Sequence, residues 1–109
     1  MIATASNRPR IVVRPATVTL RLDWLARAAS VPGKAVALGL ALLWLAQVRH
    51  APSVRLTRSA IARFSISRDA CYDALRRLEA ARLITVRRTP GHHPFVTLLG
   101  LDGHPLALQ

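Results

Sequence analysis

The chain has 109 residues, enough for one domain that closes a single hydrophobic core without metals or disulfides. Its 16 Lys and Arg residues against five Asp and Glu residues give a net charge of +11 at pH 7, which favours a polyanionic partner, above all nucleic acid. The lone Cys71 excludes an internal disulfide, and the longest apolar stretch, Ala35 to Ala46, is shorter than the about 18 to 20 residues that cross a bilayer. No secretory signal is recognised at the N-terminus, so we expect a cytoplasmic protein without a membrane partner.

The first 17 residues are basic and contain two prolines. Three arginines surround a short apolar run, Ile11 to Val13, which can pair as a strand. We interpret residues 1–17 as a flexible basic arm, residues 18–100 as a single domain and residues 101–109 as a C-terminal tail.

A short helix is the first element expected in the domain. Val18 to Leu22 alternates apolar and polar residues, as a strand does, and Asp23 can then act as the N-cap of a helix from Trp24 to Ser30. The sequence Val31-Pro32-Gly33 ends that helix.

A longer helix is expected from Lys34 to about Arg49. It is apolar on every side, which is typical of a helix buried all round. Ala35 and Gly39 lie one turn apart, so another backbone can approach closely, either from a helix of the same chain or from a second subunit. We expect a homodimer, with its interface in residues 35–48 and the N-terminal segment.

Two capped helices follow a short strand from Val54 to Leu56. Thr57 is a good N-cap for a helix to about Phe64, and a tight turn separates that helix from the next. Ser67 is the second N-cap, and its helix continues to about Arg82. The sequence therefore predicts two consecutive helices joined by a turn.

A β-hairpin is expected after these helices. Leu83 to Arg88 and Phe95 to Leu99 have strand-like patterns, and the connector from Thr89 to Pro94 is rich in turn residues. The tip of this hairpin is basic and carries two histidines.

The segment LTRSAIARFSISRDACYDALRRLEAARLITVRR has the order helix, turn, helix, hairpin and resembles the winged helix-turn-helix regulators of bacteria. The residues that carry the resemblance are Leu56-Thr57, Ile61-Ala62, Ile66-Ser67, Leu75, Leu78-Glu79 and Leu83-Ile84. The resemblance covers about residues 56–99. It implies a mainly α fold with a small β-hairpin wing, of the α+β class, with the helix-turn-helix over 57–83 and the wing over 84–99.

The sequence departs from this family at two positions. Ser65 stands where the turn often has Gly, and Arg82 stands where a Gly often ends the recognition helix. Both positions favour a positive φ, so we expect local strain or a shifted turn there.

The helix from Ser67 to Arg82 is expected to present one face to DNA. The apolar residues Cys71, Ala74, Leu75 and Leu78 lie on its core side. By position, the resemblance implies base contacts in the major groove from the opposite side, where an Arg can bind guanine and an Asp can accept from cytosine. The predicted base-contacting residues are Arg68, Asp69, Tyr72, Asp73 and Arg76.

Other polar residues are expected to contact the DNA backbone or to belong to the wing. The predicted backbone contacts are Thr57, Arg58, Ser59, Ser67 and Arg77. The predicted wing contacts are Arg87, Arg88, His92 and His93.

The same side chains also have simpler interpretations. Asp73 can pair with Arg77 and Glu79 with Arg82, as ordinary ion pairs on a helix surface. Asp69 can serve only the helix dipole, and Tyr72 can be a packing residue at the helix edge. Two Asp residues on this face repel phosphate, which favours either a base-specific task or a surface that faces another protein.

We expect sequence-specific binding to double-stranded DNA by a nucleoid-associated regulator of transcription, with no enzymatic activity, cofactor or metal. No small-molecule ligand is evident from the sequence. There is no Gly-rich phosphate loop, no paired carboxylates in a cleft and no nucleophile with a matching His and Asp, and an adjacent His pair lacks helical ligand spacing. Two alternatives stay open. One is a replication, excision or segregation factor of a plasmid, phage or mobile element, and the other is a protein-interaction winged helix within a larger nucleoprotein complex.

Overall fold

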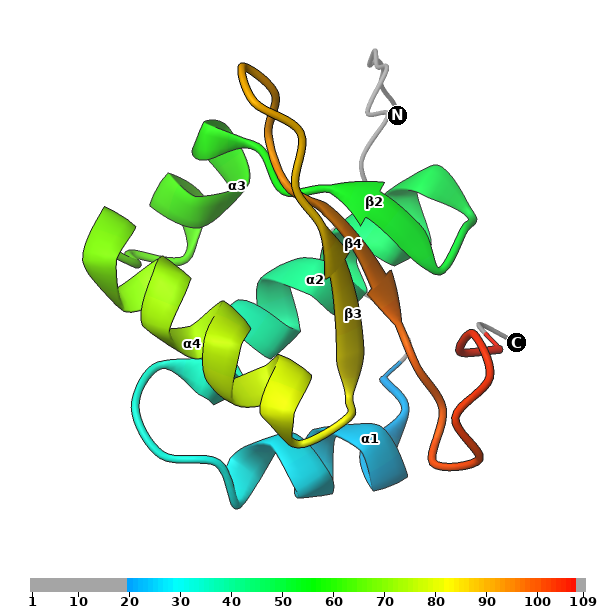
Figure 1. The fold of residues 1–109 in the computed structure, drawn as a ribbon. Coiled ribbons are helices and arrows are strands. Elements are labelled where there is room, and N and C mark those ends of the chain that lie inside the picture. Colours follow the sequence, from blue (N-terminus) through cyan, green and yellow to red (C-terminus); the bar gives the residue numbers. More distant parts are fainter. Residues whose placement is uncertain (1–19, 108–109) are drawn as a thin grey trace, which may run out of the picture.

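The computed structural model describes residues 20–107, so the predicted arm at 1–17 lies outside the described residues. Within this range the chain is an α+β domain of four helices and a three-stranded antiparallel sheet. The elements are α1 (Leu22–Ala29), α2 (Ala35–Arg49), β2 (Ser53–Arg55), α3 (Arg58–Arg63), α4 (Arg68–Ala80), β3 (Ile84–Arg87) and β4 (Phe95–Leu98). Figure 1 shows α2 behind the sheet, α1 at one end, and α3 and α4 along one side.

Helix α2 is the centre of the core, as its all-round apolar sequence predicts. It packs against α1, α3, α4 and β2, and most of its residues are buried. Gly39 lies so close to α1 that a Cβ atom there would be 3.0 Å from Cζ3 of Trp24. Of the two partners expected for this position, the structure therefore contains the helix of the same chain, and the homodimer stays a prediction. No helix within residues 20–107 has both the length and the apolar character to cross a membrane.

Helix α1 begins earlier than expected, so the prediction that Asp23 is its N-cap is wrong. The N-cap is Arg21, whose carbonyl accepts a 2.9 Å hydrogen bond from the N–H of Leu25 and thereby closes the first turn. Asp23 lies inside that turn and accepts from the N–H of Trp24 at 2.7 Å. This hydrogen bond, and the neighbouring Arg21 guanidinium, lower the pKa of Asp23.

Both predicted N-caps of the following helices are confirmed. The hydroxyl of Thr57 accepts from the N–H of Ala60 at 3.3 Å, and the hydroxyl of Ser67 accepts from the N–H of Ala70 at 3.1 Å. Each bond satisfies a backbone donor that has no partner inside its own helix. The caps therefore fix where α3 and α4 begin.

The expected positive φ values are also confirmed. Ser65, in the turn between α3 and α4, has φ 56°, and Arg82, after α4, has φ 62°. His50, which ends α2, is left-handed as well, with φ 54°. Left-handed backbone is strained for residues that have a Cβ atom, and here it turns the chain sharply at three helix ends.

The sheet has the order β2-β4-β3, so the strand before α3 completes the hairpin that follows α4. The residues paired across it alternate between two faces. The inner face carries Val54, Val96 and Val86. The outer face carries Arg55, Phe95 and Arg87. The hairpin is thus fixed to the core by its valine row, and its connector projects beyond the body (Figure 1).

The chain after β4 folds back onto the domain. Leu99 forms a bridge with Pro105, and Leu106 is buried with the core. The guanidinium of Arg21 donates a 2.8 Å hydrogen bond to the carbonyl of Ala107. These contacts bring the two ends of the described chain together.

Candidate nucleic-acid interface

Helix α4 has the two faces that its sequence predicts. Cys71, Ala74, Leu75 and Leu78 are its buried residues. On the other side, Tyr72 is 48% exposed and the side chain of Arg76 is 71% exposed. The polar face therefore lies in solvent. Figure 1 shows the helix itself beside α3 and strand β3 of the hairpin.

The N-terminal end of this face carries an arginine and a tyrosine in contact. The Cζ atom of Arg68 lies 5.9 Å from the centroid of the Tyr72 ring, within the range of a cation–π interaction. Asp69, beside them, is exposed and forms no ion pair among residues 20–107. The first turn of α4 thus presents a stacked arginine and an unpaired carboxylate.

Further along the same face, Asp73 holds two arginines at once. Its Oδ1 atom accepts a 2.6 Å hydrogen bond from Arg76, and its Oδ2 atom accepts a 2.8 Å bond from Nε of Arg77. The pair with Arg77 is the simple interpretation given to Asp73 by the sequence, and it is present. Arg76 joins it, so the three side chains form one cluster with a net charge of +1.

The predicted pair between Glu79 and Arg82 is wrong. The backbone leaves the helix at Arg82, whose φ is 62°, so the helical spacing between the two side chains is lost. Glu79 instead approaches Arg88 of the hairpin, with 3.8 Å between Oε1 and Nη1. This contact joins the end of α4 to the wing segment.

The residues at the start of α3 are placed beside this face. The Thr57 hydroxyl serves as a cap and lies 3.2 Å from the hydroxyl of Ser59. Arg58 is exposed, and its guanidinium has no hydrogen-bond or ionic partner in the described part of the chain. Ser67 uses its hydroxyl to cap α4. Of these predicted backbone contacts, Arg58 has the most freely available donors.

The hairpin holds its arginines by stacking. Arg87 lies 5.1 Å from the centroid of Phe95, and Arg55 lies 5.4 Å from the same ring. Arg55 also donates a 3.0 Å hydrogen bond to the carbonyl of His93, which fixes the base of the connector. His92 and His93 are both exposed. The structure thus places Arg55 with the basic residues of the hairpin. The sequence pattern missed this position because it depends on the pairing of β2 with β4.

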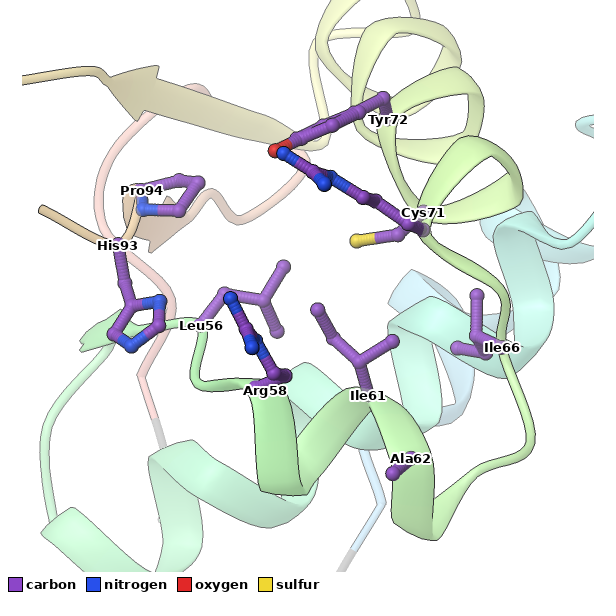
Figure 2. A pocket seen from close by; sticks show the side chains of 10 residues that line it. Leu56, Arg58, Ile61, Ala62, Ile66, Cys71, Tyr72, His93 and Pro94 are labelled. Atoms are coloured by element: carbon purple, nitrogen blue, oxygen red, sulfur yellow. The ribbon is translucent and has the colours of Figure 1, made fainter. Parts of the chain in front are cut away.

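A pocket of about 380 Å³ lies where α3, α4 and the hairpin connector meet (Figure 2). Its wall is apolar and includes Leu56, Ile61, Ile66 and Cys71. Its polar side chains are those of Arg58, Arg68, Tyr72 and His93. Burial raises the pKa of the Cys71 thiol, whose sulfur points into this space in Figure 2. Four of the predicted DNA-contacting residues therefore converge on one hollow.

No group of three or more His, Cys, Asp or Glu side chains in residues 20–107 is arranged to hold a metal ion. Comparison of the chain with protein-family models, with curated proteins and with solved structures finds no match. The interpretation of the candidate site therefore depends on its geometry and charge alone.

Proposed function

We propose that this domain is a winged helix-turn-helix that binds double-stranded DNA sequence-specifically and regulates transcription. The order of α3, a tight turn, α4 and the β3–β4 hairpin supports this proposal, and β2 supplies the third strand. The net charge of +11 supports a polyanionic partner. In this arrangement α4 enters the major groove by its N-terminal half, and the connector of the hairpin acts as the wing.

The observation that carries the proposal is the exposed pair of Arg68 and Tyr72 at the start of α4. The Arg68 guanidinium forms no ion pair with an acid of the described chain, and it is oriented by the Tyr72 ring beneath it. An arginine in this position can donate two hydrogen bonds to one guanine. Asp69, one residue on, can accept from a cytosine amino group.

The two arginines bound to Asp73 are proposed to contact different parts of the DNA. Arg76 is largely exposed and keeps N–H groups free for a base after donating one to Asp73. Arg77 is less exposed, and its Nε is committed to Asp73, so its remaining donors suit a backbone phosphate. Asp73 itself positions both side chains in our proposal.

The flanking elements supply contacts that fix the register of α4 on the duplex. At the start of α3, Arg58 with Thr57 and Ser59 faces one strand, and Ser67 adds a hydroxyl at the start of α4. The proposed wing contacts are Arg87, Arg88, His92 and His93. Such contacts add affinity and salt dependence without adding sequence information. We propose a homodimer that places two copies of α4 about one duplex turn apart.

A fluorescence-anisotropy titration on fragments of the source genome tests the proposal. We expect tight binding to a few fragments and a steep fall of affinity with salt, because each phosphate neutralised releases counterions. Equal and weak binding to every fragment would contradict a sequence-specific regulator. Mapping the bound sites across the genome separates a regulator, with sites at promoters, from a replication, excision or segregation factor, with sites at the corresponding loci.

A second candidate is a protein-interaction winged helix in a larger nucleoprotein complex. The exposed Asp69, which has no ionic partner among residues 20–107, favours it because a lone carboxylate repels phosphate. In that case Arg68→Ala and Arg76→Ala would leave the affinity for DNA nearly unchanged and would weaken the binding of a protein partner.

A further inference from the structure

The pocket between α3, α4 and the hairpin connector has an apolar wall, unlike the polar open face of α4. Its wall is formed by Leu56, Ile61, Ile66 and Cys71, with Pro94 at the connector. These groups offer no strong hydrogen bond to an incoming ligand, since a thiol is only a weak donor. A fully hydrated ion gains little from such a wall, whereas a compact apolar group loses water-exposed surface on entering it.

The polar side of the pocket carries positive charge without a matching acid. The charge comes from Arg58 of α3 and Arg68 of α4, and His93 of the connector adds an imidazole ring. No Asp or Glu among residues 20–107 lines the space. Figure 2 shows Arg58 and Tyr72 extending toward the space from its two helical walls. Within residues 20–107 neither Arg58 nor Arg68 has an ionic partner, and Arg68 lies over the ring of Tyr72. The pocket therefore presents several donors that lack an acceptor.

We propose that this pocket binds a small organic anion with an apolar body and one carboxylate. The apolar body lies against the Ile61 and Cys71 side of the wall. The carboxylate accepts charge-assisted hydrogen bonds from Arg58 and Arg68, and the Tyr72 hydroxyl can add a third. A volume of about 380 Å³ lies within the usual range for small-molecule sites.

Occupation of the pocket has a consequence for DNA, and this step rests on the proposed function. Arg58, Arg68 and Tyr72 are also proposed DNA contacts, so their donors cannot serve both partners at once. The anion and DNA therefore compete for these donors. By linkage the anion lowers the affinity for DNA by the factor by which DNA lowers the affinity for the anion. The protein would thus release DNA in response to an acidic metabolite.

Isothermal titration calorimetry without DNA tests the pocket alone. The probe is 1-naphthoate, and the controls are uncharged 1-naphthalenemethanol and inorganic phosphate. We expect one equivalent of naphthoate to bind. The affinity of each control should be at least about tenfold lower, because naphthalenemethanol lacks the carboxylate and phosphate lacks the apolar body. Phosphate binding as tight as that of naphthoate would overturn the apolar part of the proposal, and no binding of naphthoate at millimolar concentration would overturn the whole.

Two variants, Ala62→Trp and Arg58→Gln, test whether naphthoate binds in this pocket. Ala62 is exposed at the pocket edge, so Ala62→Trp should fill the space and weaken naphthoate binding about tenfold or more, without disturbing the core. Ala26→Trp, at an exposed position of α1, is the matched control and should bind normally. Arg58→Gln should weaken naphthoate but not naphthalenemethanol. Equal affinities in the two Trp variants would overturn the assignment.

A competition titration then tests the link to DNA. Naphthoate at saturation should release a bound DNA fragment from the wild-type protein but not from Ala62→Trp. If naphthoate binds and DNA binds but neither displaces the other, the regulatory step fails while the pocket and the proposed function both stand. If no DNA binds at all, the proposed function fails and the calorimetric result still decides the pocket.

Discussion

The guanidinium of Arg68 lies over the ring of Tyr72, one helical turn further along α4, with 5.9 Å between its Cζ atom and the ring centroid. Both side chains are exposed. Such stacking is worth about 0.5–1 kcal/mol at an exposed site, enough to restrict the rotamers that the arginine samples. An arginine that is already oriented loses less conformational entropy when it binds.

Arg68→Ala should weaken binding to the specific DNA site about 5- to 150-fold, the range expected for loss of one bidentate base contact worth about 1–3 kcal/mol. Anisotropy titrations with the specific fragment and a scrambled fragment measure the effect, and the scrambled fragment should lose much less. Arg27→Ala is the control. Arg27 belongs to α1 and donates to the carbonyl of Ala81 at the C-terminal end of α4, so the variant loses the same charge away from the proposed interface. It should bind both fragments nearly as the wild type does. Equal losses on the two fragments would show that Arg68 contacts only the backbone.

Asp73→Asn should release Arg76 and Arg77 and remove a negative charge from the face. We expect tighter binding to nonspecific DNA and a steeper dependence on salt, because more free guanidinium groups reach phosphates. Specificity for the chosen fragment should fall, since Arg76 is no longer positioned. The variant should also lose about 0.3–1 kcal/mol of stability, the usual range for exposed helix pairs. Unchanged salt dependence would show that the cluster lies away from DNA.

Ser65→Gly and Arg82→Gly should each raise the free energy of unfolding. Their φ values of 56° and 62° are strained for residues with a Cβ atom and free for glycine. We expect a gain of about 0.5–1 kcal/mol from each, after allowing for the greater freedom of glycine in the unfolded chain. Urea denaturation measures the gain, and the double variant should show the sum because the two turns are separate. Ser65→Ala is the control and should give no gain.

Gly39→Ala should destabilise the monomer fold. A Cβ atom at this position would lie 3.0 Å from Cζ3 and 3.2 Å from Cη2 of Trp24, whose indole N–H donates a 3.1 Å hydrogen bond to the carbonyl of Leu83. The ring has little room to move, so we expect a loss of about 1–3 kcal/mol in urea denaturation. Ala37→Gly, at a half-buried position of the same helix, controls for helix propensity. Wild-type stability in Gly39→Ala would contradict the close packing of α1 on α2.

The thiol of Cys71 should make stability fall at alkaline pH. Burial raises its pKa, so as the pH passes the ordinary thiol value, about 8.5, the unfolded chain loses a proton that the folded chain keeps. This ionisation therefore leaves the free energy of unfolding unchanged below that pH and lowers it above that pH. Cys71→Ala should show a smaller decrease between about pH 8 and pH 10 when both proteins are measured by urea denaturation under reducing conditions. Parallel curves for the two proteins would contradict the shift.

The sequence alone determined the features that depend on neighbouring residues. The N-caps Thr57 and Ser67 act on N–H groups three residues away, and the buried side of α4 follows from a spacing of 3.6 residues per turn. For these features the interacting groups lie within one or two helical turns of each other, so the pattern is sufficient. The positive φ of Ser65 and Arg82 was expected for another reason, because these positions often hold Gly in the family that the segment resembles.

Contacts between distant parts of the chain depend on the three-dimensional packing. That α1 rather than a second subunit packs on Gly39 depends on Trp24, which is fixed by a hydrogen bond to a residue 59 positions away. The pairing of β2 with β4 places Arg55 beside Phe95. Because Arg82 has a left-handed backbone, Glu79 approaches Arg88 instead of Arg82. Such contacts form between surfaces whose relative position depends on the packing of the whole core, and a one-dimensional pattern does not carry that information.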